Sequence, residues 1–138
     1  LQRFSLTTNA SWIRSRVRLK PHLTEIGSRE HPLEGQPDYL LNGTLSCAFP
    51  GRRAEVSLLV NAVGRRLETL GLYGRPDIYE QPTTALDAAA TWRPRPYLGL
   101  KAGGRNLFDT EARRVQGNLE TYRARSGRSC SLALSFGG

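Results

Sequence analysis

The stretch Tyr97–Phe108, YLGLKAGGRNLF, sets the pattern for the whole chain. Its apolar residues fall on one parity and its small or polar residues on the other: Leu98, Leu100 and Ala102 against Gly99, Lys101 and Gly103. Successive side chains of a β-strand point to opposite faces, so this period of two predicts a strand with one apolar face. The block RNLFD, which ends at Asp109, closes the stretch.

The same period of two recurs elsewhere in the chain, separated by segments rich in proline and glycine. We therefore predict about six strands: Leu1–Leu19, Tyr39–Phe49, Ala54–Leu72, Thr83–Trp92, the opening stretch and Arg128–Phe136. The fold class is all-β, an antiparallel up-and-down meander that forms one unit over residues 1–138. The run Ala88–Ala90 favours helix by propensity. Its position between Pro82 and Pro94 leaves too little room for a helix, and we interpret it as strand.

The links between these strands alternate in length. We expect short links at Pro50–Arg53 and Arg93–Pro96, and long links at Lys20–Asp38, Tyr73–Pro82 and Asp109–Asn118. In a meander, strict alternation places all the long loops at one end of the sheet. Outer-membrane barrels show this asymmetry, with short periplasmic turns and long extracellular loops.

The apolar parity of the last five strands carries no charge, whereas the opposite parity is mostly Ser, Thr, Asn, Gly and Ala. An apolar belt against lipid and a polar interior would produce this contrast. We therefore predict these lipid-facing residues: Leu41, Leu45, Phe49, Leu58, Leu86, Trp92, Leu98, Leu100, Leu132, Leu134 and Phe136. Phe49, Trp92 and Phe136 lie at the short-turn ends of their strands, as in an aromatic girdle at a membrane interface.

Several motifs resemble one family, the TonB-dependent outer-membrane receptors. The motif NLFD at Asn106–Asp109, followed about thirty residues later by a strand that ends in Phe136, is similar to the last strands of their barrel. The segments PLEGQP at Pro32–Pro37 and PDIYEQP at Pro76–Pro82 also resemble the loops of that family. The resemblance covers nearly the whole chain and implies the C-terminal part of a 22-stranded barrel. The plug domain, the TonB box and the remaining strands have no counterpart in the sequence.

The resemblance implies a receptor in the bacterial outer membrane that imports a scarce solute, such as a siderophore, cobalamin or a glycan. Its partners would be outer-membrane lipid and lipopolysaccharide, the small solute, and TonB through parts of the chain not present here. Solute contacts are expected in the extracellular loops, at Arg29, His31, Tyr73, Arg75, Tyr79 and Glu80. The sequence contains no Met and begins at Leu1, from which we expect a piece of a longer polypeptide.

The formal net charge is +8, and all but two of the 20 basic residues are arginine. This composition favours partners with phosphate or carboxylate groups. The arginines are scattered near strand ends and loops, so lipid or lipopolysaccharide phosphates suit them as well as nucleic acid, which we do not expect as a partner. The longest apolar runs are far shorter than the roughly 18 residues that a membrane helix needs.

No catalytic constellation emerges from the sequence, and we expect neither an enzyme nor a metal or cofactor. His22 and His31 lie in the first long loop, where a lone histidine is usually solvated. Cys47 and Cys130 fall on strands that should not be neighbours, which predicts two small apolar side chains and no disulfide. Two alternatives stay open: a soluble basic β-sheet module that is monomeric without detergent, and a passive outer-membrane barrel without a plug.

Overall fold

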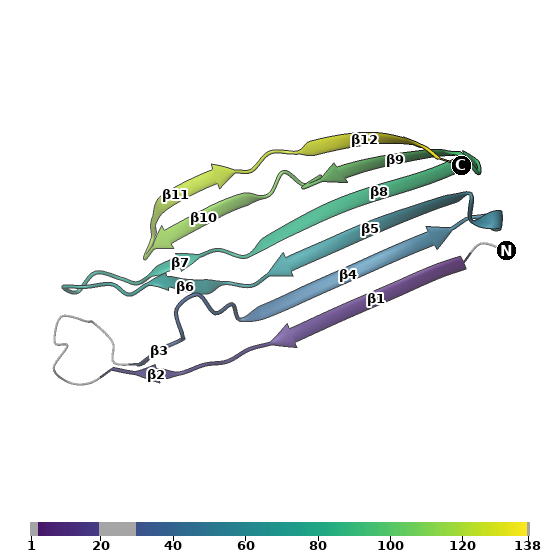
Figure 1. Cartoon of the computed structure of the whole chain (residues 1–138). Helices are drawn as coiled ribbons and strands as arrows, with labels where there is room; N and C mark the ends of the chain where they lie inside the picture. Colours follow the sequence, from purple (N-terminus) through teal and green to yellow (C-terminus); the bar gives the residue numbers. More distant parts are fainter. Residues whose placement is uncertain (1–2, 20–29, 138) are drawn as a thin grey trace.

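The computed structural model describes residues 3–19 and 30–137, and these residues form an all-β structure. The elements, labelled in Figure 1, are β1 Arg3–Trp12, β2 Val17–Arg18, β3 Glu30–His31, β4 Tyr39–Ala48, the 3-10 turn η1 Pro50–Arg52, β5 Ala54–Val63, β6 Arg66–Thr69, β7 Ile78–Glu80, β8 Thr83–Arg95, β9 Leu98–Arg105, β10 Glu111–Gln116, β11 Leu119–Arg125 and β12 Ser129–Phe136. The predicted all-β class is confirmed.

Six long strands form one antiparallel sheet in the order β1-β4-β5-β8-β9-β12. Neighbours in the sheet follow one another along the chain among these six, which confirms the predicted meander. The start of β1 and the end of β12 lie at the same end of the sheet as the short links (Figure 1). We call this the turn end; it contains η1 and the turn at Pro96–Tyr97. The sheet does not close on itself.

Three strand limits differ from the prediction. β1 ends at Trp12 instead of continuing to Leu19. The predicted strand Ala54–Leu72 is interrupted at Gly64, where a Cβ atom would lie 2.7 Å from the Tyr39 ring. This close approach needs glycine. β8 continues through the predicted turn Arg93–Pro96 as far as Arg95, with a bulge after Trp92 that accommodates Pro94, which has no N–H to donate.

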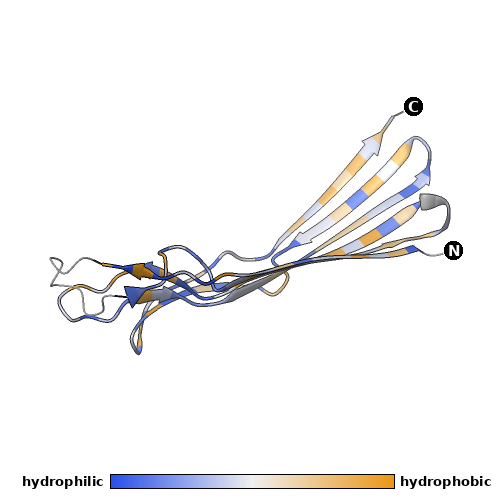
Figure 2. Ribbon diagram, turned by 90° about the horizontal axis from the view of Figure 1, so that it is seen from below, coloured by the Kyte–Doolittle hydropathy of each residue, from blue (hydrophilic) through white to orange (hydrophobic). Residues whose placement is uncertain are grey.

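The prediction of loops at Tyr73–Pro82 and Asp109–Asn118 was wrong in part, because each of these links contains a strand. Beyond the six-stranded sheet, the hairpins continue into a four-stranded sheet of order β11-β10-β7-β6, which we call the outer sheet. Two of its strands, β10 at Glu111–Gln116 and β7 at Ile78–Glu80, lie in segments that the sequence pattern predicts as loops. β2 and β3 form a further pair, with Val17 opposite His31. Figures 1 and 2 show the outer sheet and this pair at the end away from the chain termini.

The NLFD motif forms the junction between β9 and β10. Asn106 and Asp109 both have φ near +53°, a left-handed conformation that Asn and Asp tolerate better than most residues. The Asn106 side-chain oxygen accepts a hydrogen bond from the Thr110 N–H at 2.9 Å, and the Asn106 N–H donates to Asp87 Oδ1 at 2.9 Å. The motif therefore turns the chain and anchors this turn to β8.

The six-stranded sheet is a single layer, so it has little interior of its own. Among the described apolar residues only Ala62 and Leu67 are buried, and Leu67 is 1% exposed. Leu67 lies in the outer sheet, where its carbonyl accepts a hydrogen bond from the Gly35 N–H at 2.8 Å. Burial is thus greatest where the chain that follows β3 covers the outer sheet. Both faces of the six-stranded sheet are largely exposed.

Candidate functional site

The strand register gathers the apolar residues of all six long strands on one face, which we call the apolar face. Paired residues of an antiparallel sheet point to the same side. Leu45 lies between Leu6 and Leu58, and Val60 is opposite Leu86. Figure 2 shows apolar bands alternating with polar ones along these strands. On this face the described residues are Phe4, Leu6, Thr8, Ala10, Trp12, Tyr39, Leu41, Gly43, Leu45, Cys47, Ala54, Val56, Leu58, Val60, Ala62, Thr84, Leu86, Ala88, Ala90, Trp92, Leu98, Leu100, Ala102, Gly104, Cys130, Leu132, Leu134 and Phe136.

The residues predicted to face lipid all share this face. Phe49 lies one residue beyond β4, and its N–H donates to the Ala54 carbonyl at 2.9 Å, which continues the ladder. Many of these side chains are open to the surroundings, and Leu132 is 76% exposed. A continuous face of this kind, with Arg95 beyond the β8 bulge as its one charged residue among those described, is unusual on a protein surface in water.

Aromatic residues lie at both ends of the apolar face. Trp12 stacks on Tyr39 with ring centroids 6.2 Å apart at the end near the outer sheet. Phe49, Trp92 and Phe136 lie at the turn end. β4 has ten residues, and at about 3.4 Å per residue it is roughly 34 Å long. Tilted by roughly 45°, it would span about 24 Å, close to the roughly 25 Å apolar band of membrane barrels.

The opposite face, which we call the polar face, carries rows of small polar side chains. Asn9, Asn42 and Asn61 lie side by side on three neighbouring strands, and Asn61 Nδ2 donates to Asn42 Oδ1 at 2.7 Å. Ser5, Ser46 and Ser57 form a second row. Charged residues also occur on this face of the described strands: Arg3, Glu55, Asp87, Arg93, Lys101 and Arg105. The two faces therefore differ in chemistry along the whole sheet.

His31 is clamped beside the outer sheet and is not solvated, contrary to the expectation for a loop histidine. It is 6% exposed, and its Nδ1 lies 3.0 Å from Asp77 Oδ2. The other carboxylate oxygen of Asp77 accepts a hydrogen bond from the Gly71 N–H at 2.8 Å. A Cβ atom on Gly71 would lie 2.0 Å from the Arg75 carbonyl oxygen, so this close turn needs glycine. Asp77 thus joins β3 to the chain between β6 and β7.

Ion pairs connect the strands of the outer sheet. Glu80 accepts a hydrogen bond from Arg66 Nη2 at 2.8 Å and lies 4.0 Å from Arg114 Nε. Arg114 also pairs with Glu68 at 3.0 Å. Two further pairs join β10 and β11, Arg113 with Glu120 and Arg125 with Glu111, and Arg123 pairs with Glu120 within β11. The carboxylate of Glu120 has its pKa held below the ordinary value, chiefly by the hydrogen bond from Arg123.

Tyr79 lies on β7 beneath a guanidinium group. The Arg65 guanidinium carbon is 3.8 Å from the centre of the Tyr79 ring, a cation–π contact. Burial raises the pKa of the Tyr79 hydroxyl, and the Asp77 and Asp38 carboxylates raise it further, while Arg65 lowers it. The neutral phenol is therefore the favoured form in the folded state.

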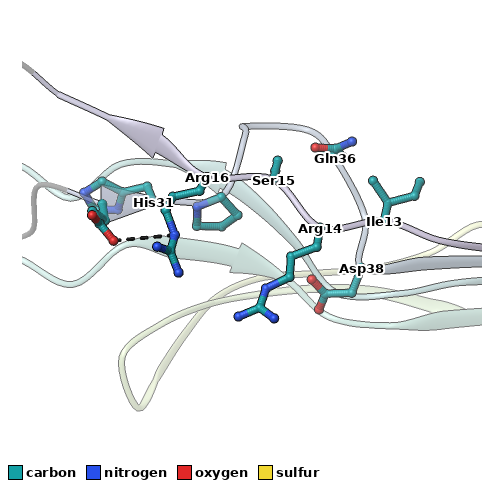
Figure 3. A pocket seen from close by; sticks show the side chains of 9 residues that line it. Ile13, Arg14, Ser15, Arg16, His31, Gln36 and Asp38 are labelled. Carbon is teal, nitrogen blue, oxygen red and sulfur yellow. Dashed lines mark ion pairs between the residues drawn. The ribbon is translucent and has the colours of Figure 1, made fainter.

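A cavity of about 310 Å³ opens between the chain that follows β1 and the chain that follows β3. In Figure 3 the side chains of Arg14 and Asp38 point to one side of the chain and that of Ser15 to the other. The Ser15 hydroxyl accepts a hydrogen bond from the Leu33 N–H at 2.8 Å, and Arg16 lies 3.6 Å from Glu30. This cavity could not be predicted from the sequence, because its two walls are separated along the chain.

The structure does not bring the predicted solute-binding residues into one site. Tyr79 and Glu80 belong to β7 and not to a loop, and His31, Tyr79 and Glu80 are all engaged in the contacts above. Tyr73 and Arg75 are exposed and line a separate cavity of about 570 Å³ together with Leu70, Gly71, Leu72 and Gln116. Arg29 lies outside the described residues.

Cys47 and Cys130 are free, on strands that are not neighbours in the sheet, as predicted. Residues 3–19 and 30–137 contain no cluster of three or more His, Cys, Asp or Glu side chains arranged to hold a metal ion. None of the described segments is a helix long and apolar enough to cross a membrane.

Comparison with known proteins adds no relative. No protein-family model matches the sequence, and neither a curated protein nor a solved structure matches it.

Proposed function

We propose that the chain forms part of the wall of a β-barrel in the bacterial outer membrane. One observation carries the proposal. The register places 28 uncharged residues of six strands on one face, and Arg95 joins this face only at its turn end, beyond the bulge in β8. The opposite face of the same strands carries rows of Asn and Ser and six charged residues. A lipid-facing exterior and a polar lumen account for both faces at once.

Two further observations support a barrel wall. Each of β1 and β12 has one edge without a partner strand among the described residues. An unpaired backbone edge is very unfavourable in lipid, so the proposal requires further strands that complete the sheet. The short links also lie at one end and the long hairpins at the other, as in outer-membrane barrels (Figure 1).

The finer proposal is a TonB-dependent receptor that takes up a scarce solute, and it rests on the motifs NLFD, PLEGQP and PDIYEQP. Among the residues predicted to contact the solute, Tyr73 and Arg75 are available at the surface, beside a cavity. His31, Tyr79 and Glu80 would act indirectly, because they hold the hairpins that present this cavity. Binding of TonB would involve other parts of the polypeptide.

Leu58 and Leu59 provide a matched test. They are adjacent in β5, each is 41% exposed, and they point to the apolar and the polar face respectively. Leu58→Arg should reduce assembly in the outer membrane strongly, because arginine on a lipid face near the bilayer centre costs roughly 2–4 kcal/mol. Leu59→Arg should assemble at close to the wild-type level. The measurement is the amount of full-length polypeptide in purified outer membranes.

The alternatives predict different outcomes. In a soluble β-sheet module, two equally exposed leucines should tolerate arginine equally, so equal levels for both variants would refute the barrel. A passive barrel and a receptor give the same result here. They differ in uptake: a receptor needs TonB and an energised inner membrane, whereas a passive barrel conducts solute without them.

A further inference from the structure

Basic side chains collect at the turn end of the six-stranded sheet. The exposed basic residues there are Arg3, Arg53, Arg93, Arg95 and Lys101. Glu55 is the one acidic residue described at the turn end. It lies opposite Thr91, which in turn lies opposite Lys101. The turn end therefore carries five exposed cations and one carboxylate among the described residues.

The arginines away from the turn end are mostly neutralised by carboxylates. Arg16 and Arg18 pair with Glu30, and similar pairs hold Arg66, Arg113, Arg114, Arg123 and Arg125. Within residues 3–19 and 30–137, none of the five turn-end cations forms an ion pair with a carboxylate. These five groups consequently lack an internal counter-charge and are available to an anion from outside the chain.

The bulge in β8 turns one of these cations onto the rim of the apolar face. After the bulge, Arg95 lies opposite Leu98, which in turn pairs with Phe136 on the apolar face. The Arg95 guanidinium donates to the Tyr97 hydroxyl at 3.0 Å and lies 5.9 Å from the ring centre. An arginine here can lay its stem on apolar surface while its head reaches a polar boundary.

On the polar face, Arg93 and Lys101 line a shallow cavity of about 200 Å³ with Thr91 and Ser135. No carboxylate lines this cavity. Guanidinium groups bind phosphate oxygens with charge-assisted, often paired hydrogen bonds. In the proposed barrel this cavity faces the lumen, so Arg93 and Lys101 add to the positive charge of the turn end, while Arg53 and Arg95 are the cations placed to reach the lipid.

We propose that the turn end binds the anionic headgroups of phospholipids such as phosphatidylglycerol in the leaflet that it reaches. This inference rests on the proposed function, since it takes the apolar face to lie in the membrane. The arginines would follow directly after the aromatic residues of the apolar face, at the height of the headgroup phosphates. Basic residues near an anionic leaflet attract it within a Debye length.

The test compares two triple variants of the full-length polypeptide with the same change of charge. Arg53→Gln, Arg93→Gln and Arg95→Gln remove turn-end cations. Arg16→Gln, Arg18→Gln and Arg123→Gln remove exposed arginines that already pair with carboxylates. Native mass spectrometry would count phosphatidylglycerol and phosphatidylcholine retained by each purified protein in mixed lipid–detergent micelles.

Each unpaired arginine should favour phosphatidylglycerol by roughly fivefold, so the turn-end variant should lose at least about tenfold of the preference shown by the wild type. The control variant should keep the preference, and added salt should lower it in the wild type. An equal preference in both variants, or none in the wild type, overturns the inference. A wild-type polypeptide that retains neither lipid and fails to assemble in membranes overturns the proposed barrel as well.

Discussion

The six-stranded sheet and the outer sheet share the same hairpins but are held together by different means. In the six-stranded sheet, one face has no charged residue except Arg95 at its turn end, and the rows on the other face are mostly small and polar. In the outer sheet, charged residues pair across nearly every strand, as at Arg66, Glu80 and Arg114. The change occurs within single hairpins, close to Gly64 on β5–β6 and Asn106 on β9–β10.

This difference indicates a change of surroundings along the strands. Ion pairs exposed to water contribute little each, and a network of them suits a region that is solvated. A backbone ladder between uncharged side chains suits an apolar medium, where an unpaired charge is very unfavourable. We therefore expect substitutions in the outer sheet to lower its local stability and to leave that of the six-stranded sheet unaltered.

The largest effect is expected at Asp77. Asp77→Ala removes the contact with His31 and the hydrogen bond from the Gly71 N–H. Because these groups are buried or half-buried, the outer region should lose about 2–4 kcal/mol of local stability. Hydrogen exchange of the full-length polypeptide in detergent should speed up in residues 66–80, while β4 and β5 stay protected.

Arg75→Ala is the matched control, because Arg75 is exposed and only two residues away. It should leave the exchange of both sheets at the wild-type rate. If Asp77→Ala loosens β4 and β5 as much as residues 66–80, the two regions are a single cooperative unit and the comparison fails.

Much of the six-stranded sheet could be predicted, because its strands follow a period of two without charges on one parity. Leu98, Leu100 and Ala102 show this, and the register then places their neighbours. The outer sheet was missed because segments such as Glu111–Arg125 carry arginine and glutamate on both parities. Ion pairs between strands, and not burial of one face, stabilise such a segment, and alternation of hydropathy does not reveal them.

The outer contacts were beyond sequence reasoning for another reason. His31 and Asp77 are 46 residues apart, and only the folded hairpins bring them together. Tyr73 and Tyr79 were likewise predicted to lie in one loop, but Tyr79 belongs to β7 and Tyr73 lines a separate cavity. The absence of a disulfide between Cys47 and Cys130 could be predicted, because a meander keeps strands that are distant along the chain apart in the sheet.

A smaller effect is expected at Glu80. Glu80→Gln keeps the side-chain shape but removes the charge that faces Arg66 and Arg114. The two arginines then repel each other, and local stability of the outer sheet should fall by about 1–2 kcal/mol after allowance for solvent screening. The measurement is again hydrogen exchange, now with and without added salt.

Glu55→Gln serves as the control for Glu80→Gln, since Glu55 is a carboxylate of the six-stranded sheet that forms no ion pair among the described residues. Its exchange profile should match the wild type at both salt concentrations. Salt should reduce the difference between wild type and Glu80→Gln, and a difference that salt leaves unchanged would show that lost packing, and not charge, is the cause.

The smallest effect is a dependence on alkaline pH that belongs to the outer sheet. Burial raises the pKa of Tyr79 above its ordinary value. The folded state therefore holds the phenolic proton more tightly than the unfolded state. The resulting stability is complete below the unfolded pKa, and it is lost as the pH rises through the higher folded pKa. The near-ultraviolet absorbance of ionised tyrosine, compared between wild type and Tyr79→Phe, should give a midpoint above that of a free tyrosine amide. A midpoint at or below the free amide would mean that Arg65, which lowers this pKa, dominates the site and that the ring is not shielded by the outer sheet.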